Sequence, residues 1–233
     1  PQRYIKKECK NFWHIYSSKG LDQCLSDDHP SIYIDRKDKW HIISTKEMVE
    51  KMQAHPGSSI GFSPCAFNYS GKGIELSDSQ IKLMCAVICD GSFYAKAKPN
   101  QESYNTCRFH IKKDRKKKRL IEIFKECNLP YKIVKSAAPG YDDLYVKAPL
   151  RSKIFDKSWY NCSQHQLQII CDNIIFWDGS ITKAGSLQFT SNVKNNITFV
   201  QFAFASCGYR TKIVEYDRRG QKHKAKEKEY VYK

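Results

Sequence analysis

Acidic residues are scarce in this chain of 233 residues, because 24 Asp and Glu stand against 40 Lys and Arg and leave a formal net charge of +16. A charge of this size favours polyanionic partners, of which nucleic acid is the commonest. Long hydrophobic runs are also missing: runs such as Cys85–Cys89 are far shorter than the ~20 residues of a membrane-spanning helix. No basic segment followed by an apolar one opens the chain, so we expect an intracellular protein without a membrane partner.

Paired cysteine motifs are absent as well. Ten cysteines are spread along the chain and no CxxC occurs, which excludes zinc ribbons and zinc knuckles. Several cysteines lie inside apolar runs, where a thiol behaves as a small hydrophobic group. We therefore expect reduced core cysteines rather than a disulfide framework.

A hydrophobic core is well supplied. Hydrophobic residues make up 41% of the chain and aromatic residues 13%, which excludes disorder of the whole chain. At roughly 150 residues per domain, the length predicts one or two domains.

The positive charge is concentrated in a few segments. Residues 112–119 read KKDRKKKR, and residues 217–229 hold six basic and three acidic residues, which for this second segment can equally form a solvated face. In residues 92–98 and 107–112, polar or basic side chains alternate with apolar ones. This alternation predicts half-buried strands, joined by a polar hairpin tip at 99–106. Such a ribbon fits the major groove of DNA.

The second half of the chain repeats the first. Residues 124–134 (FKECNLPYKIV) match residues 204–214 (FASCGYRTKIV), 80 positions later. Two Asp-Gly-Ser triplets, at 90–92 and 178–180, are 88 positions apart, so the first copy holds eight additional residues. These residues fall in the predicted hairpin tip, which is typical of the duplication of one structural unit.

Each copy is predicted to fold as αββαββ. An apolar helix leads to each Asp-Gly, over residues 78–89 and 164–177, and the glycine ends it. A second helix with apolar residues at helical spacing is predicted around 120–127 and again around 197–207. The strands that follow the second helices are expected near 131–136, 141–147, 209–216 and 228–232.

Asp90 and Asp178 occupy equivalent positions at the ends of the two apolar helices. If these helices pack side by side, the two carboxylates meet near a pseudo-two-fold axis. Carboxylates beside free helix-terminal carbonyls suit a hard cation such as Mg²⁺, and metals beneath a basic surface can promote phosphodiester cleavage. An Asp-Gly at a helix end is also a common turn, and this alternative stays open.

The two segments resemble a known family. LMCAVICDGS (83–92) and CDNIIFWDGS (171–180) are similar to the two dodecapeptide motifs of single-chain LAGLIDADG homing endonucleases. The resemblance implies two αββαββ units with saddle-shaped antiparallel sheets. It also implies that the protein is a monomer and that its sheets straddle a long, asymmetric site in double-stranded DNA. It implies cleavage of both strands by Mg²⁺-dependent hydrolysis, with Ca²⁺ or Mn²⁺ as substitutes in vitro.

The resemblance also assigns roles to the motif residues. It makes Asp90 and Asp178 the catalytic and metal-binding acids, and it aims the carbonyls of Cys89 and Trp177 at the metals. Asn173 and Trp177 depart from the family pattern, since small residues usually stand there and let the helices touch. We therefore expect a less intimate helix crossing.

Basic and polar residues complete the implied site. The polar position after the second strand corresponds to Lys113, and a basic residue near the acids is expected at Lys157 or Lys153. DNA contacts are expected from Ser92, Tyr94, Lys96, Lys98, Asn100, Gln101, Tyr104, Asn105, Arg108, His110, Lys112, Ser180, Thr182, Lys183, Gln188, Thr190, Arg210 and Lys212.

The first 76 residues take no part in the repeat. LSDDHP (25–30) and the segment after it resemble the middle of an intein splicing domain, with Ser26 and His29 in place of its Thr-x-x-His block. His29 can equally be a turn residue before proline. The terminal residues that splicing needs are not found at either end of this sequence, so we expect no splicing.

Three domains are therefore expected: a β-rich, splicing-domain-like segment at 1–76 with possible accessory DNA contacts, and two repeats at 77–162 and 163–233. The leading hypothesis is a site-specific DNA endonuclease. One alternative is a DNA- or RNA-binding relative with impaired catalysis, a maturase or transcription factor, which Asn173 and Trp177 favour and the two retained acids oppose. Another is a bulk nucleic-acid coat protein such as a ribosomal protein, which needs neither the duplication nor the acids.

Overall fold

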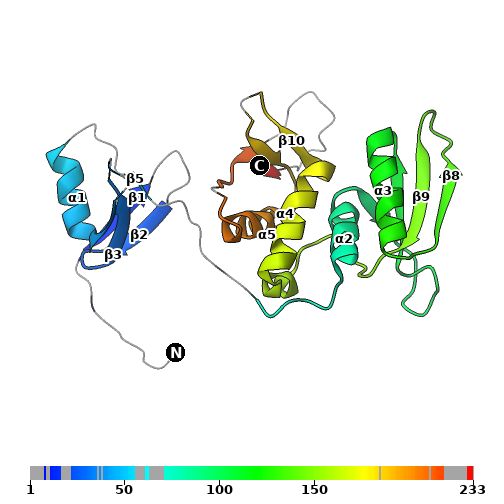
Figure 1. The fold of residues 1–233 in the computed structure, drawn as a ribbon, viewed down its shortest axis with the longest axis horizontal. Coiled ribbons are helices and arrows are strands. Elements are labelled where there is room, and N and C mark those ends of the chain that lie inside the picture. The colour runs from blue at the N-terminus through cyan, green and yellow to red at the C-terminus, as the bar shows by residue number, and fades with distance from the viewer. Residues whose placement is uncertain are drawn as a thin grey trace. The chain divides into compact units, whose positions relative to one another are not determined.

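The computed structural model describes residues 8, 11–16, 22–35, 37, 39–55, 61–62, 71–183, 185–209, 211–217 and 230–232. The chain divides into two compact units, Pro1–Ala66 and Phe67–Lys233. The mixed α+β class with antiparallel sheets is confirmed (Figure 1). Within the described ranges, no helix is long and apolar enough to cross a membrane. All the cysteines described there are free thiols.

The smaller unit combines short antiparallel strands with one helix. Strands β1 (Phe12–Tyr16) and β2 (Asp22–Ser26) form a hairpin, and β3 (Pro30–Ile34) pairs with β4 (Trp40–Ser44) and β5 (Gly61–Phe62). Helix α1 (Thr45–Ala54) follows β4 directly, because Ser44 and Glu47 form a capping box. The N–H of His29 donates to the carbonyl of Ser26, so His29 lies in a turn.

The first half of the larger unit is helix, two strands, helix, two strands. Its helices are α2 (Asp78–Asp90) and α3 (Asp114–Glu126), and its strands are β6 (Gly91–Phe93), β7 (Thr106–Ile111), β8 (Tyr131–Lys135) and β9 (Asp142–Lys147). The four strands form one antiparallel sheet in the order β6-β7-β9-β8. Burial alternates along β7 as the period-two pattern predicts, with Cys107, Phe109 and Ile111 buried.

The second half repeats this order with shorter strands. Its elements are η1 (Lys157–Asn161, a 3-10 helix), α4 (Gln164–Asp178), β10 (Gly179–Ile181), β11 (Leu187–Phe189), α5 (Lys194–Ser206), β12 (Glu215–Asp217) and β13 (Tyr230–Tyr232). Within the described residues, its strands form two separate pairs, β10 with β11 and β12 with β13. Helices α2 and α4 both begin with a Ser-x-x-Gln capping box, at Ser77 and Ser163.

The predicted repeat register appears in the structure. Helices α3 and α5 begin 80 residues apart, at Asp114 and Lys194. After them, Asn128 and Gly208 hold equivalent left-handed conformations, with φ of 50° and 86°. In the strand pairs, Gly91 faces Phe109 and Gly179 faces Phe189. The connection between the paired residues is therefore eight residues longer in the first half, as the sequence predicts.

Two local predictions were wrong. The strand expected over 92–98 ends at Phe93, because turn hydrogen bonds such as Ala97 N–H to the Tyr94 carbonyl (3.2 Å) take over. Among the described residues, 209 and 211–214 do not form a strand, and regular pairing begins at Glu215. A glycine ends each helix as predicted, and both glycines are extended rather than left-handed, with φ of −73° at Gly91 and −106° at Gly179. They are required by space: a Cβ at Gly179 would lie 2.3 Å from the carbonyl oxygen of Ile175.

One hydrophobic core unites both halves of the larger unit. Helices α2 and α4 pack against each other along their length, and Figure 1 shows them side by side. Leu83, Met84 and Val87 of α2 are fully buried, as are Leu167 and Ile174 of α4. Burial of several such side chains, each worth about 1.5–3 kcal/mol, fixes the two helices relative to each other. The residues at their C-terminal ends are fixed with them.

Candidate functional site

The two predicted acids lie at the ends of the packed helices. Asp90 is the last residue of α2, and Asp178 is the last residue of α4. The carboxylates lie close enough for the charge of Asp90 to raise the pKa of Asp178. The structure therefore brings together the two residues that the repeat singled out.

Asp90 has a cationic partner that sequence reasoning missed. Lys116 Nζ lies 2.5 Å from Asp90 Oδ2, and only 10% of the lysine side chain and 20% of the aspartate side chain are exposed. Lys116 Nζ also lies 6.0 Å from the centre of the Trp177 ring. Lys116 belongs to the KKDRKKKR run, and the packing of α3 makes it the buried residue of the first helical turn.

Asp178 is held differently. Its side chain reaches the surface, but protein atoms on its other sides remove part of its hydration, which raises its pKa, and the charge of Asp90 raises it further. Lys116, Lys153 and a hydrogen bond with the Cys89 thiol oppose this rise. Burial keeps the pKa of Cys89 well above its ordinary value, so the thiol stays protonated as a donor.

Of the three lysines predicted for the site, Lys153 is the one whose charge acts on Asp178. Lys113 is the N-cap residue of α3 and is exposed. Lys157 begins η1 and is also exposed. Lys153 is the one of the two candidate lysines whose charge lowers the pKa of Asp178. The carbonyl of Lys153 accepts a hydrogen bond from Asn196 Nδ2 (3.1 Å), which fixes its backbone.

The donor set suits Mg²⁺ held in an incomplete shell. Among the described residues, no group of three or more His, Cys, Asp and Glu side chains is arranged to hold a metal ion. Magnesium does not require such a cage, since it keeps several waters and is usually bound by one or two carboxylates and by substrate phosphates. Asp90 and Asp178 fit that pattern, and the carbonyls of Cys89 and Trp177 remain predicted ligands.

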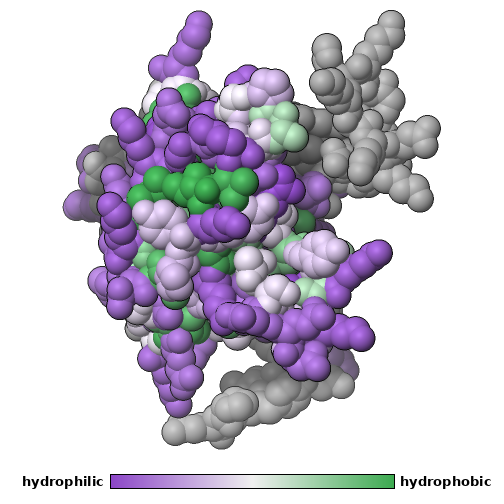
Figure 2. Space-filling model, turned by 90° about the vertical axis from the view of Figure 1, so that its right-hand side faces the viewer, coloured by the Kyte–Doolittle hydropathy of each residue, from purple (hydrophilic) through white to green (hydrophobic). Residues whose placement is uncertain are grey.

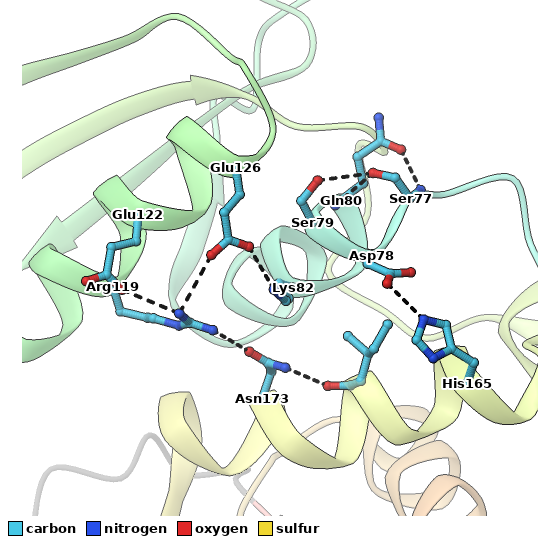
Figure 3. Close-up of polar contacts among 11 residues, drawn as sticks. Ser77, Asp78, Ser79, Gln80, Lys82, Arg119, Glu122, Glu126, His165 and Asn173 are labelled. Carbon is cyan, nitrogen blue, oxygen red and sulfur yellow. Dashed lines mark hydrogen bonds and ion pairs between the residues drawn. The ribbon is translucent and has the colours of Figure 1, made fainter.

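The two residues that depart from the family pattern are both accommodated. Figure 3 shows Asn173 between α4 and α3, where its Oδ1 accepts from Arg119 Nη2 (3.1 Å) and its Nδ2 donates to the Ile169 carbonyl (2.7 Å). Arg119 also pairs with Glu126, which in turn pairs with Lys82 of α2 at 2.8 Å. Asn173 thus belongs to a polar network that joins three helices.

Trp177 is buried, with 3% of its surface exposed, and packs against Phe176 at 5.0 Å between ring centres. Its bulk does not keep α2 and α4 apart, because buried residues of both helices, Trp177 included, belong to one hydrophobic core cluster.

The outward face of β7 carries predicted DNA contacts, but they are not free. Arg108 Nη2 lies 2.8 Å from Asp143 Oδ2, and His110 Nδ1 lies 2.7 Å from Asp143 Oδ1. Burial alone would raise the pKa of Asp143, but its bonds to His110 and Arg108 outweigh this effect and lower it. The His110 ring stacks on Tyr141, with 4.4 Å between centres. Asp143 therefore holds both basic side chains in fixed orientations.

Lys112 also lies beside Tyr141, with its Nζ 5.7 Å from the centre of the Tyr141 ring. Figure 2 shows the side of the larger unit that bears β8 and β9, and it is mostly hydrophilic with small apolar areas. Ile133 and Val134 of β8 are among the exposed apolar residues, at 40% and 38%.

The hairpin tip between β6 and β7 is anchored by a residue that was not predicted. Arg151 donates to the carbonyls of Tyr94 and Tyr104, and its guanidinium lies 4.4 Å from the Tyr104 ring centre. The Oδ1 of Asn105 is buried and has no hydrogen-bond partner within the described part of the chain, so it faces inward. Among the contacts predicted over residues 92–105, the exposed ones are Ser92, Tyr94, Lys96, Lys98, Asn100 and Gln101.

The second half offers fewer exposed candidates. Ser180, Lys183 and Lys212 are exposed, and Thr182, Gln188 and Thr190 are partly buried. Thr182 Oγ1 is already used, because it accepts from the Ser186 N–H (3.0 Å) in the turn after β10. Arg210 and residues 218–229 lie outside the described residues.

Comparison with known proteins finds no matching family model and no matching curated protein. Among solved structures, the chain is similar to full-length DUF199/WhiA from Thermatoga maritima, with 10% identity and a TM-score of 0.44 over 69% of this chain and 52% of that one. The chain thus spans about half the length of that protein. It is similar to mesophilic variants of the homing endonuclease I-DmoI, with 19% identity and a TM-score of 0.44 over 66% of this chain and 87% of that one.

I-DmoI in complex with DNA and Ca gives 18% identity, a TM-score of 0.44 and coverage of 66% and 80%. At these identities the likeness concerns the fold, and the TM-scores are below 0.5. The function of this chain therefore has to be argued from its own residues.

Proposed function

We propose that this protein is a site-specific endonuclease that cuts double-stranded DNA by metal-dependent hydrolysis of phosphodiester bonds. The observation that carries the proposal is the pairing of Asp90 with Asp178 at the ends of the two packed helices. A divalent cation, when bound, would stabilise the negative charge that develops on the phosphate. The long asymmetric target, the monomeric state and an intracellular location belong to the same proposal.

The chain's own residues have separate tasks in this proposal. Asp90 and Asp178 supply the carboxylate oxygens. Lys116 and Lys153 place positive charge beside them, where it attracts a phosphate and stabilises the negative charge that develops on it. The exposed basic residues of the hairpin tip hold the DNA backbone over the acids.

A second candidate has one observation in its favour. Because Lys116 already neutralises Asp90, the same scaffold could bind DNA or RNA without cutting, as a maturase or transcription factor would. A binding protein needs the basic surface but not the acids.

The decisive experiment incubates the protein with a randomised duplex library and Mg²⁺ and sequences the cut ends. We expect a defined set of ends from the wild type, and none from Asp90→Asn or Asp178→Asn, which should still bind the selected duplex in Ca²⁺. Asp172→Asn is the matched control, because Asp172 lies on α4 but is exposed and bonded to Gln168. Binding with no cut ends in the wild type would favour the second candidate.

A further inference from the structure

The two acids of the site do not have equivalent surroundings. Asp90 is partly buried and already paired with Lys116 at 2.5 Å. Asp178 is exposed, and among the described residues no Lys, Arg or His lies within ion-pairing distance of it. The Asp178 carboxylate accepts a hydrogen bond from the neutral thiol of Cys89.

The repeat shows where this difference comes from. Lys116 and Asn196 are 80 residues apart and occupy the same position in α3 and α5. Asn196 is 3% exposed, and its side-chain amide is hydrogen-bonded to the backbone, with its Oδ1 accepting from the Phe155 N–H (2.9 Å). The second half therefore has no counterpart of the Lys116 ammonium.

A cation that approaches Asp90 meets a resident cation. The Lys116 ammonium lies against one carboxylate oxygen, and only 10% of its own side chain is exposed, so the surrounding protein holds it beside Asp90. Two positive charges cannot share one carboxylate at this distance without strong repulsion. A cation that approaches Asp178 meets no ammonium of the described residues in direct contact with the carboxylate, and the charges of Lys116 and Lys153 act on Asp178 only from beyond ion-pairing distance.

We propose that Lys116 is an internal counter-ion that competes with divalent cations for Asp90, so that the two carboxylates take up metal with unequal affinity. This inference rests on the proposed function only in that it requires the acids to bind a divalent cation. It predicts that the strand served by Asp178 is cut before the strand served by Asp90, and that Lys116 sets the interval between the two cuts.

Mn²⁺ binding tests the inference without a DNA target. Free Mn²⁺ is measured by electron paramagnetic resonance during titration of the wild type and of Lys116→Gln. Removing the competing charge should tighten Mn²⁺ binding by at least about tenfold. Lys117→Gln is the matched control, since Lys117 is next on α3 but pairs with Asp142, and it should leave the affinity unchanged.

Two further variants guard against a folding artefact. Lys116→Arg keeps the charge and should retain the wild-type affinity, and thermal melts identify any variant that is not folded. In the double variant Asp90→Asn/Lys116→Gln, the tightening should disappear, because the carboxylate for which Lys116 competes is gone.

The outcomes separate the inference from the proposed function. Unchanged or weaker Mn²⁺ binding by folded Lys116→Gln, with binding still lost in Asp178→Asn, would overturn the inference alone. No Mn²⁺ binding by any variant, including Lys116→Gln, would overturn both the inference and the metal-dependent function.

Discussion

The two halves of the larger unit share a chain path but have diverged in what they bury. In the first half, one sheet of four strands supports a basic amphipathic α3, and polar contacts join α3 to α4. In the second half, α5 is apolar, and its Phe199 packs in an aromatic group with Phe155 and Trp159. Equivalent backbone positions in the two halves therefore carry side chains with opposite roles, charged in the first half and hydrophobic in the second.

The largest expected effect comes from positions 119 and 199, which are equivalent in the repeat. Phe199 is fully buried, so Phe199→Ala should lower the free energy of unfolding by about 3–5 kcal/mol. Arg119 is 31% exposed, and Arg119→Ala should cost about 1–2 kcal/mol through the unsatisfied Asn173 amide. Urea denaturation measures both values. Equal losses at the two positions would contradict the proposed division between a polar and an apolar half.

An intermediate effect is expected from pH, with opposite signs in the two halves. The folded state raises the pKa of Asp178 above its ordinary value of 3.8, so ionisation of Asp178 destabilises the fold as pH rises above that value. Asp178→Asn should therefore be more stable than the wild type at pH 7, and the difference should vanish below pH 3.8.

Asp143 should behave in the opposite way. The fold lowers the pKa of Asp143 below 3.8, so its stabilising contribution is present above that value and is lost as pH falls through the lowered pKa. Asp143→Asn should be less stable than the wild type at pH 7 and equal to it in strong acid. Thermal melts across pH check both variants, and a parallel pH response of the two would exclude the contrast.

The smallest effect is expected from exposed lysines of the two hairpin tips. Lys98 in the first tip and Lys183 in the second are exposed, so replacing either by Ala should leave stability within about 0.5 kcal/mol. If each neutralises one phosphate, each change should reduce the slope of log K against log salt concentration by about 0.9. Fluorescence anisotropy with duplex DNA measures the slope. A loss in the first tip alone would show that only the longer hairpin reaches the DNA.

Much of this arrangement could be predicted because repetition constrains the backbone. The helices before Asp90 and Asp178 and the eight-residue difference followed from periodicity and register. The partner of Asp90 could not be predicted, because seven basic residues in one run differ only in helical phase, and which one turns inward depends on the packing of α3. Asn173 was likewise misread, since its fit depends on Arg119, which lies 54 residues away in the sequence.

The segment before α2 is hydrogen-bonded to the segment before α4. Gly71 N–H donates to the Cys162 carbonyl (3.1 Å) and Gly73 N–H to the Asn161 carbonyl (2.8 Å), while Gln166 bonds both the N–H and the carbonyl of Ile74. These hydrogen bonds join the segment before α2 to the segment before α4. The two segments lie so close that a Cβ at Gly71 would lie 2.2 Å from the carbonyl oxygen of Asn161. Fragments produced by a break between the repeats would each display one side of this seam, which makes the pair suited to reassembly as a split protein.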